Sequence, residues 1–261
     1  MRSIKHISII GSGNVATHLG HGLFAKGLVI DAVYSRKINR AKKLANKIKA
    51  KSTASLNKLP KDSDLYIIAV SDDAIDSVAS KLEQLVNEKS ILAHTSGSVS
   101  AGIFNRIQSG VFYPLQSFSL NRSVDLRAVP FCIYSHEDRV VKLLTTLAKK
   151  LSKEVNYITD EQRSALHLAA VFSSNFTNHM YHIAAGICKV NQVDFNILKP
   201  LILETATKIK SESPHNMQTG PARRGDQKTI NIHLKKLTNN KSSKDIYSLI
   251  SKNIKSQYTK G

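Results

Sequence analysis

A glycine-rich hexapeptide near the N-terminus has the residue types and the spacing of a nucleotide-binding turn. It directly follows a predicted strand, Lys5–Ile10, and consists of Gly11, Ser12, Gly13, Asn14, Val15 and Ala16. In a G-x-G-x-x-A pattern the first glycine makes a tight turn, the second lets the backbone approach a pyrophosphate, and the alanine lets the helix pack closely on the sheet. The unpaired amides at the start of that helix attract an anion. The pattern therefore predicts a dinucleotide site, with a chance glycine-rich turn as the weaker alternative.

The end of the second predicted strand bears on which dinucleotide is bound. A site for NAD has an Asp or Glu there, which binds the ribose 2′-hydroxyl. Here the strand ends in Ser35 and Arg36, and Asp31 lies toward its other end. Ser35 can hydrogen-bond a 2′-phosphate, Arg36 can pair with it and stack on adenine, and Arg40 could join from one helical turn further on. These residues predict NADP rather than NAD, unless Arg36 is only a surface residue at a helix start.

Two more strand ends carry residues that could contact the same ligand. Val70 and Ser71 close one predicted strand, and Thr95 and Ser96 follow another. Ligands of open α/β sheets bind at the carboxyl ends of strands. We therefore expect these four residues beside the cofactor, although Asp72 or Ser96 could equally cap a helix.

Three polar residues near neighbouring strands are candidates for substrate chemistry. His94 ends a predicted strand, and Tyr113 and Gln116 belong to the Tyr-Pro-Leu-Gln segment after the next one. If these strands are neighbours, Tyr113 and Gln116 lie next to His94. We expect catalytic roles for His94 and Tyr113 and substrate binding by Gln116. The alternative is a proline-fixed loop with Tyr113 packed in the core.

A proline-free run from Asp160 to about Lys189 predicts a long helix, and Thr159 to Gln162 fits a capping box at its start. One stripe of this helix is polar among apolar neighbours: His167, Ser174, Asn178 and Tyr181, flanked by Asn175 and His182. Unpaired buried polar groups cost about 1–3 kcal/mol each, so such a stripe needs partners or faces solvent. It therefore favours a cleft or a domain interface at least as much as a solvent-facing surface.

Within this stripe His167 is the first candidate for the acid or base, because a histidine titrates near neutral pH. His94 and Tyr113 are the second choices. Asn175 and Asn178 would orient a substrate, which Ser174 would also bind.

The string Thr219 to Asp226, Thr-Gly-Pro-Ala-Arg-Arg-Gly-Asp, predicts a tight loop. Arg223 and Arg224 carry forked donors suited to a carboxylate or phosphate. We expect them to bind an anionic substrate, with Asp226 as the N-cap of the next helix or the partner of one arginine. A simple capped loop is the alternative.

The pattern of apolar runs predicts an α/β fold, with a Rossmann doubly wound, mostly parallel sheet followed by an all-helical second domain. Strands and helices alternate over residues 1–158, whereas residues 159–261 contain only helical segments. The first range is expected to bind the cofactor and the second to bind substrate and dimerise. The predicted strands are Ile7–Ile10, Leu28–Tyr34, Leu65–Val70, Ser90–His94, Val111–Tyr113, Pro130–Tyr134 and Val155–Ile158. The predicted helices are Asn14–Lys26, Asn39–Lys49, the run from Asp160, Asp194–Glu212, Asp226–Leu237 and Ser243–Ser256.

The composition excludes some classes of protein and favours a reducing compartment. Among 261 residues, 38 are Lys or Arg and 19 are Asp or Glu, which gives a formal charge of +19. Such a surface attracts anions. Most of the excess is lysine scattered along predicted helices, however, which favours a plain solvated surface. No dense basic block interleaved with aromatics indicates nucleic-acid binding. Cys132 and Cys188 suggest buried thiols, and we expect no metal site. Neither a signal peptide nor an apolar run of about 18 residues is evident, so we expect a cytoplasmic protein without membrane spans.

Several of these strings together resemble a known family. They are G-S-G-N-V-A-T-H-L, H-T-S-G-S, Y-P-L-Q-S-F, H-L-A-A-V-F-S-S-N-F and T-G-P-A-R-R-G-D. The chain resembles Rossmann-like proteins that carry a C-terminal domain of unknown function 2520. Its first domain is similar to deazaflavin-dependent NADP oxidoreductases, pyrroline-5-carboxylate reductases and the 6-phosphogluconate dehydrogenase group. The resemblance implies an NADP-binding domain, a helical domain that often dimerises, and a cleft between them.

Two departures from the related families affect the expected site. Many members have His-Pro-Leu-Gln where this chain has Tyr113 first, so one type of proton donor replaces another. The Lys-x-x-x-Asn pair of the related dehydrogenases is not evident, and His167 with Asn175 or Asn178 occupies a comparable helix.

The sequence thus favours an NADP-dependent oxidoreductase acting on a small, anionic carbonyl or imine substrate, with Arg223 holding the anion. A non-catalytic NADP(H)-binding sensor is the main alternative, favoured by the missing lysine. A basic nucleic-acid binder is the third.

Overall fold

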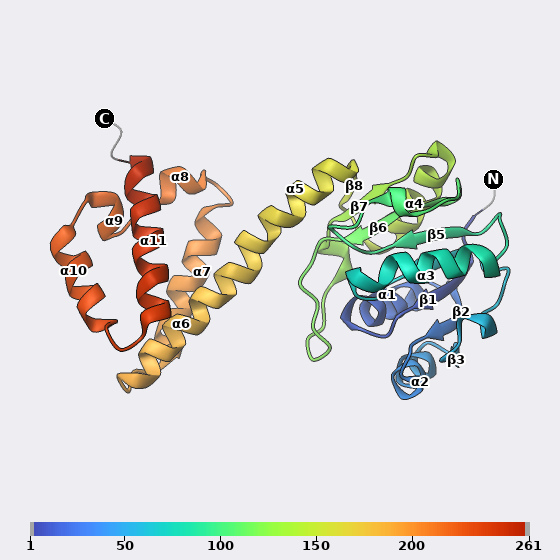
Figure 1. Cartoon of the computed structure of the whole chain (residues 1–261), viewed down its shortest axis with the longest axis horizontal. Coiled ribbons are helices and arrows are strands. Elements are labelled where there is room, and N and C mark those ends of the chain that lie inside the picture. The colour runs from blue at the N-terminus through green and yellow to red at the C-terminus, as the bar shows by residue number, and fades with distance from the viewer. Residues whose placement is uncertain (1–2, 259–261) are drawn as a thin grey trace. The chain divides into compact units, whose positions relative to one another are not determined.

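The computed structural model describes residues 3–258. The chain divides into two compact units, residues 1–174 and residues 175–261. Figure 1 follows the chain through both. Each unit is described by itself, and the expected domain boundary after residue 158 stays a prediction.

The first unit is built on an eight-stranded sheet with the order β3-β2-β1-β4-β5-β6-β7-β8. All neighbouring strands are parallel except β6 and β7, which are antiparallel. This is the strand order of a doubly wound dinucleotide-binding fold, so the predicted fold class is confirmed. The strands are β1 (His6–Ile10), β2 (Val29–Tyr34), β3 (Lys51–Thr53), β4 (Leu65–Ile68), β5 (Ile91–His94), β6 (Ser109–Pro114), β7 (Phe131–Tyr134) and β8 (Val155–Tyr157).

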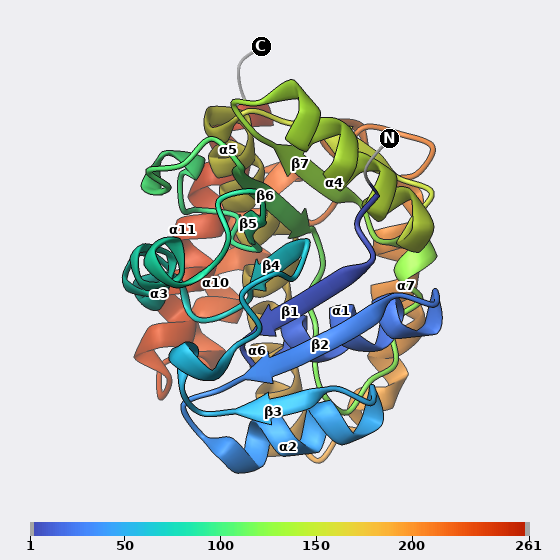
Figure 2. The ribbon, with the colours of Figure 1, turned by 90° about the vertical axis from the view of Figure 1, so that its right-hand side faces the viewer.

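Helices cover both faces of this sheet, because successive residues of its central strands point to opposite sides. In β1, Ile7 and Ile9 belong to one buried cluster and Ile10 to the other. The first cluster includes residues of α1 (Asn14–Ala25), α2 (Ile38–Lys47) and α4 (Asp138–Leu151), and the second includes residues of α3 (Asp72–Leu85). The end-on view separates α3 from α1 and α2 across the sheet (Figure 2). Short 3₁₀ turns lie at Leu56–Lys58, Ala101–Ile103 and Leu126–Ala128.

The register of the sheet brings three strand ends together. Ile10 of β1 is paired with Tyr34 of β2 on one side and with Ile68 of β4 on the other. The residues that follow these strands therefore meet at one edge, which is the topological switch point where open α/β sheets bind ligands.

The first unit ends in α5 (Asp160–Ala170), and the predicted capping box starts this helix. The Thr159 amide donates to Gln162 Oε1 at 3.0 Å, and the Gln162 amide donates to Thr159 Oγ1 at 3.3 Å. The helix does not continue as a regular α-helix to residue 189. A π-helical segment, Val171–Phe176, precedes α6 (Thr177–Val190).

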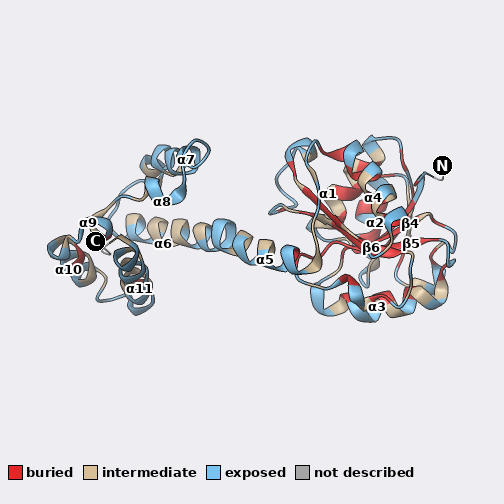
Figure 3. Cartoon of the chain, turned by 90° about the horizontal axis from the view of Figure 1, so that it is seen from above, coloured by how far each residue is buried: buried red, intermediate tan, exposed pale blue. Residues whose placement is uncertain are grey.

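The second unit consists of helices joined by turns and contains no strand among its described residues, up to residue 258. It contains α6, α7 (Lys199–Lys208), α8 (Pro214–Met217), α9 (Pro221–Arg224), α10 (Gln227–Lys236) and α11 (Lys241–Tyr258), with a 3₁₀ turn at Phe195–Leu198. Among its described residues only Ala222, Ile230 and Ser243 are buried, and Figure 3 shows the contrast with the first unit. None of the helices within residues 3–258 is long and apolar enough to cross a membrane.

Candidate functional site

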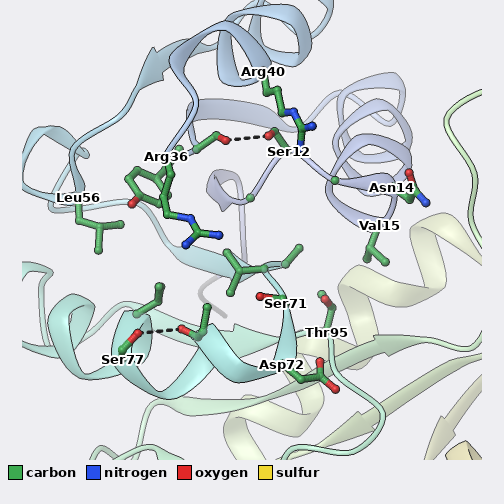
Figure 4. A pocket seen from close by; sticks show the side chains of 18 of the residues that line it. Ser12, Asn14, Val15, Arg36, Arg40, Leu56, Ser71, Asp72, Ser77 and Thr95 are labelled. Carbon is green, nitrogen blue, oxygen red and sulfur yellow. Dashed lines mark hydrogen bonds between the residues drawn. The ribbon is translucent and has the colours of Figure 1, made fainter.

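A cavity of about 520 Å³ lies where β1, β2 and β4 end, and Figure 4 shows the side chains around it. Ten of the twelve residues predicted to bind the cofactor line it. These are Gly11, Ser12, Gly13, Asn14, Val15, Ser35, Arg36, Val70, Ser71 and Thr95.

The two positions of the turn, 11 and 13, require glycine for different physical reasons. Gly11 has a φ of +133°, and a Cβ there would lie 2.1 Å from the carbonyl oxygen of Ala69. Gly11 is therefore required by the fold, because it lets the chain cross from β1 over the end of β4. A Cβ on Gly13 would meet no atom within 4 Å. No side chain caps α1, which begins directly after Gly13, so this open space in front of its amides fits a pyrophosphate.

Two of the predicted cofactor residues do not line the cavity. Ala16 is fully buried between α1 and the sheet, which is the packing role its motif predicts. Ser96 is buried after β5, where its Oγ accepts hydrogen bonds from the amides of Ser98 and Val99 at 3.1 Å. Ser96 therefore fixes its own turn instead of facing the cavity.

One end of the cavity is cationic. Arg36, Arg40 and Lys81 line it, and Asp72 is its single acidic lining residue. Within residues 3–258 the charged groups of these three side chains have no hydrogen bond or ion pair to a protein group. Ser35 lies beside them and accepts a hydrogen bond from Ser12 Oγ at 2.9 Å. Unpaired guanidinium groups next to a hydroxyl suit a phosphate monoester.

One wall of this cavity comes from α3 and was not predicted from the sequence. Ala74, Ser77, Val78 and Lys81 line it, together with Tyr34 and Leu56. The spacing of the α3 residues places them on one helix face. That spacing was visible in the sequence, but nothing in it said which face of the helix points to the ligand.

Tyr113 and His167, both predicted as catalytic, are brought together within the first unit. Tyr113 lies on β6, and its hydroxyl is 3.3 Å from Nδ1 of His167 on α5. Burial raises the pKa of Tyr113 to about 12, so its phenol stays protonated at neutral pH. Gly97 lies against both side chains, since a Cβ there would be 2.5 Å from His167 Nδ1 and 2.9 Å from Tyr113 Cζ.

His94 has an environment unlike that of an acid or base in contact with substrate. It is fully buried, its Nδ1 accepts a hydrogen bond from the Ser96 amide at 3.2 Å, and its ring stacks on Phe104 at 5.8 Å. Burial lowers the pKa of His94 to about 4. The imidazole is therefore neutral at physiological pH and inaccessible, and its hydrogen bond to Ser96 gives it a structural role.

The predicted substrate-binding residues remain predictions. Gln116 and Ser174 are exposed in the first unit, and the Gln116 Oε1 accepts a hydrogen bond from the next amide at 2.8 Å. Asn175 and Asn178 are exposed in the second unit, and nothing places them beside the pair in the first.

The segment that contains Arg223 and Arg224 is a short helix, α9, instead of the predicted loop. Gly220 and Gly225, with φ of +102° and +68°, flank this helix, and the Asp226 carboxylate accepts from the Thr229 amide as the predicted N-cap of α10. Arg223 is already engaged, because it donates to the carbonyl oxygens of Asn216 and Gln218 and lies over the ring of Tyr258. Its role in binding an anion stays a prediction, as does that of the exposed Arg224.

Two family models match the chain. One, described as NADP oxidoreductase coenzyme F420-dependent, matches residues 6–97, and the other, a domain of unknown function (DUF2520), matches residues 129–254. None of the curated protein sequences matches the chain.

Solved structures similar to this chain share both of its units. A Bacteroides fragilis protein, provisionally described as an NADP oxidoreductase, is 38% identical with a TM-score of 0.92, and the match covers 97% of this chain and 98% of that one. A Thermotoga maritima protein is 24% identical with a TM-score of 0.72, covering 96% and 97%. An imine reductase from Myxococcus stipitatus in complex with NADP⁺ is 14% identical with a TM-score of 0.71, covering 98% and 96%, and shows the shared fold alone.

The predicted family and the predicted cofactor, NADP, agree with these matches. The prediction depended on the turn from Gly11 to Ala16, on Ser35 and Arg36 at the end of the second strand, and on the helical second domain. The chain belongs to the family of two-domain proteins in which an NADP oxidoreductase domain is followed by a DUF2520 domain.

Proposed function

We propose that this protein is an NADP-dependent oxidoreductase that acts on a small carbonyl or imine compound. One relationship carries the proposal. Thr95 lines the cofactor cavity, and Gly97, two residues further along the same turn, lies against His167 and Tyr113. A single turn after β5 thus connects the proposed cofactor site with a pair of side chains able to move a proton.

The residues of the cavity would hold the cofactor through its phosphates. The pyrophosphate would lie over Gly13 at the uncapped start of α1. The 2′-phosphate would pair with Arg36 and Arg40 and accept a hydrogen bond from Ser35, which favours NADP(H) over the analogue without that phosphate. When bound, NADP(H) supplies the hydride, and the protein supplies orientation and the proton.

We assign the transfer of the proton to the substrate to the Tyr113–His167 pair. In this assignment the phenol of Tyr113, which burial keeps protonated, donates to His167 Nδ1. The imidazole then carries its own proton on Nε2. As Nε2 passes this proton to a carbonyl oxygen or imine nitrogen, Nδ1 would take the phenolic proton of Tyr113, which solvent restores after the turnover. Ser174 and Gln116, which belong to the same unit as this pair, would contact the substrate.

The proposed substrate is anionic. Its support is the formal charge of +19, which draws anions to the surface, and the two arginines of α9. The carbonyl or imine class is supported by the fold shared with the Myxococcus imine reductase. A panel of 2-oxo acids, aldehydes and cyclic imines covers this chemistry.

The experiment follows NADPH consumption with that panel for the wild-type protein, His167→Ala and Tyr113→Phe. We expect His167→Ala to lower turnover by about 10²–10⁴-fold, the usual contribution of a general acid. His136→Ala, at an exposed histidine before α4, is the matched control and should keep full activity. Unchanged turnover in His167→Ala contradicts the assignment. Tight NADPH binding without oxidation by any compound supports a non-catalytic NADP(H) sensor instead.

We also propose that the second unit assembles with a second copy of the chain. Only three of its described residues are buried, whereas Val190 and Leu249 are 84% and 71% exposed. A unit with so little buried surface is only marginally stable without a partner, and pairing of identical chains is the commonest solution. Light scattering on the purified protein should give twice the mass of one chain, and the mass of one chain contradicts the proposal.

A further inference from the structure

The first turn of α5 contains a buried arginine that the proposed chemistry does not use. Arg163 is 1% exposed. Its Nη1 donates to Asp160 Oδ1 at 2.6 Å, and its Nη2 donates to the carbonyl oxygen of Val99. The buried guanidinium therefore connects α5 to the segment that follows β5.

Asp160 holds the same segment from one helical turn earlier. Its Oδ2 accepts hydrogen bonds from the Ser100 hydroxyl and, at 2.7 Å, from the Ala101 amide. Together Asp160 and Arg163 bind the backbone or side chain of three successive residues, Val99, Ser100 and Ala101. We call these two residues and their ion pair the α5 clasp.

The α5 clasp is not needed to start the helix. The capping box of Thr159 and Gln162 already caps this end of α5 by satisfying the amides of these two residues. A buried ion pair is also a poor source of stability, because desolvation of its charges offsets their attraction. The α5 clasp therefore calls for another explanation, namely the fixed position of α5 on the segment after β5.

His167 lies four residues after Arg163, one turn along the same face of α5. The segment that the clasp holds begins two residues after Gly97, the point where His167 and Tyr113 approach the backbone. Rotating or sliding α5 on this segment would therefore separate His167 Nδ1 from the Tyr113 hydroxyl. We propose that Asp160 and Arg163 are positioning residues that hold His167 against Tyr113, an inference that rests on the proposed function of that pair.

The test replaces the guanidinium by a side chain of similar length without charge, Arg163→Met, and adds Arg163→Lys as the conservative variant. NMR contacts between the rings of His167 and Tyr113, assigned with His167→Ala and Tyr113→Phe, report the position of the helix without any substrate. We expect Arg163→Met to lose these contacts and to lower kcat by about 10–100-fold, as a small displacement of a catalytic group does. NADPH affinity should stay unchanged, and Arg163→Lys should recover part of both signals.

Asp160→Asn keeps the test decisive if Arg163→Met fails to fold, because its side chain is smaller and partly exposed. The matched control is Arg127→Met, which breaks an exposed Asp–Arg pair of the same unit, Arg127 Nη2 to Asp125 Oδ2 at 3.1 Å. Ring contacts that persist in folded Arg163→Met or Asp160→Asn overturn the positioning role. If the contacts are lost while turnover stays at the wild-type rate, the positioning role is supported and the proposed function of His167 is contradicted.

Discussion

Gly97 lies directly against the imidazole of His167, so that a Cβ atom on Gly97 would be 2.5 Å from His167 Nδ1. Real Cβ atoms do not approach another atom so closely, and Tyr113 Cζ would be only 2.9 Å away. The contact between α5, β6 and the turn after β5 therefore exists only because residue 97 has no side chain.

Gly97→Ala is accordingly expected to displace His167 and to reduce turnover by about tenfold or more, since catalytic groups tolerate little misplacement. NADPH binding should change little, because Gly97 does not line the cofactor cavity. Steady-state kinetics and NADPH titration on the same preparation measure both quantities.

The matched control for Gly97→Ala is Gly186→Ala. Gly186 lies within α6, and a Cβ there meets no atom within 4 Å. Alanine is favoured over glycine inside a helix by about 0.5–1 kcal/mol, so this variant should be as active as the wild type and slightly more stable. Full activity of Gly97→Ala would show that the Tyr113–His167 contact is not needed for turnover.

Substitutions of the two glycines of the nucleotide turn should affect different properties, one the stability of the fold and the other the binding of the cofactor. Gly11→Ala forces a Cβ against the Ala69 carbonyl at a φ of +133°, and we expect it to lower the free energy of unfolding by about 1–3 kcal/mol or more. Gly13→Ala places a methyl group in open space, so it should unfold like the wild type but bind NADPH more weakly. Urea unfolding and NADPH titration distinguish these outcomes, and equal effects on both properties contradict the separation.

Local signals in the sequence predicted much of this site. The capping box at Thr159, the N-cap at Asp226 and the turn from Gly11 depend on neighbouring residues, so their spacing alone reveals them. The edge strand β3 was missed because it has three residues, begins with Lys51 and contains no apolar run.

Other features depend on partners distant in the chain, which a single sequence does not reveal. Arginine is usually a surface residue, yet Arg163 is buried and donates to the carbonyl oxygen of Val99, 64 residues earlier. His94 was a catalytic candidate because it ends a strand near the ligand edge, but it is fully buried and stacks on Phe104. The loop expected around Arg223 folded into a helical turn because Gly220 and Gly225 supply positive φ at both of its ends.

Arg36→Met should weaken the binding of NADPH and leave that of NADH nearly unchanged. A hydrogen bond to a charged group contributes about 1.5–3 kcal/mol, so the loss of affinity for NADPH should be about tenfold or more. Thermal-shift titrations with NADPH, NADH, NADP⁺ and NAD⁺ measure it, because a ligand that binds only the folded state raises Tm. Arg122→Met, at an exposed arginine outside this cavity, is the control. Equal losses for both cofactors in Arg36→Met would mean that Arg36 contacts the adenine but not the 2′-phosphate.

The burial of His94 makes stability depend on pH in a defined window. Its pKa is about 4 in the folded protein, against 6.5 for an unperturbed histidine. Between these values the unfolded chain binds more protons than the folded chain, so stability is complete above about pH 6.5 and decreases as the pH falls toward about 4. Protonation of His94 in the unfolded chain therefore lowers the free energy of unfolding by about 3 kcal/mol over this range, since one unit of pKa corresponds to about 1.4 kcal/mol.

His94→Gln removes this titration while keeping a side-chain acceptor for the Ser96 amide, which now donates to His94 Nδ1. The variant is expected to be less stable than the wild type at neutral pH, because it loses the stacking on Phe104. Its stability should nevertheless decrease less on acidification, and the difference in slope between the two proteins isolates His94 from the carboxylates. Urea unfolding at a series of pH values gives both slopes. Parallel curves for wild type and variant would mean that His94 titrates alike in the folded and unfolded chain, and that its burial carries no cost for the charged form.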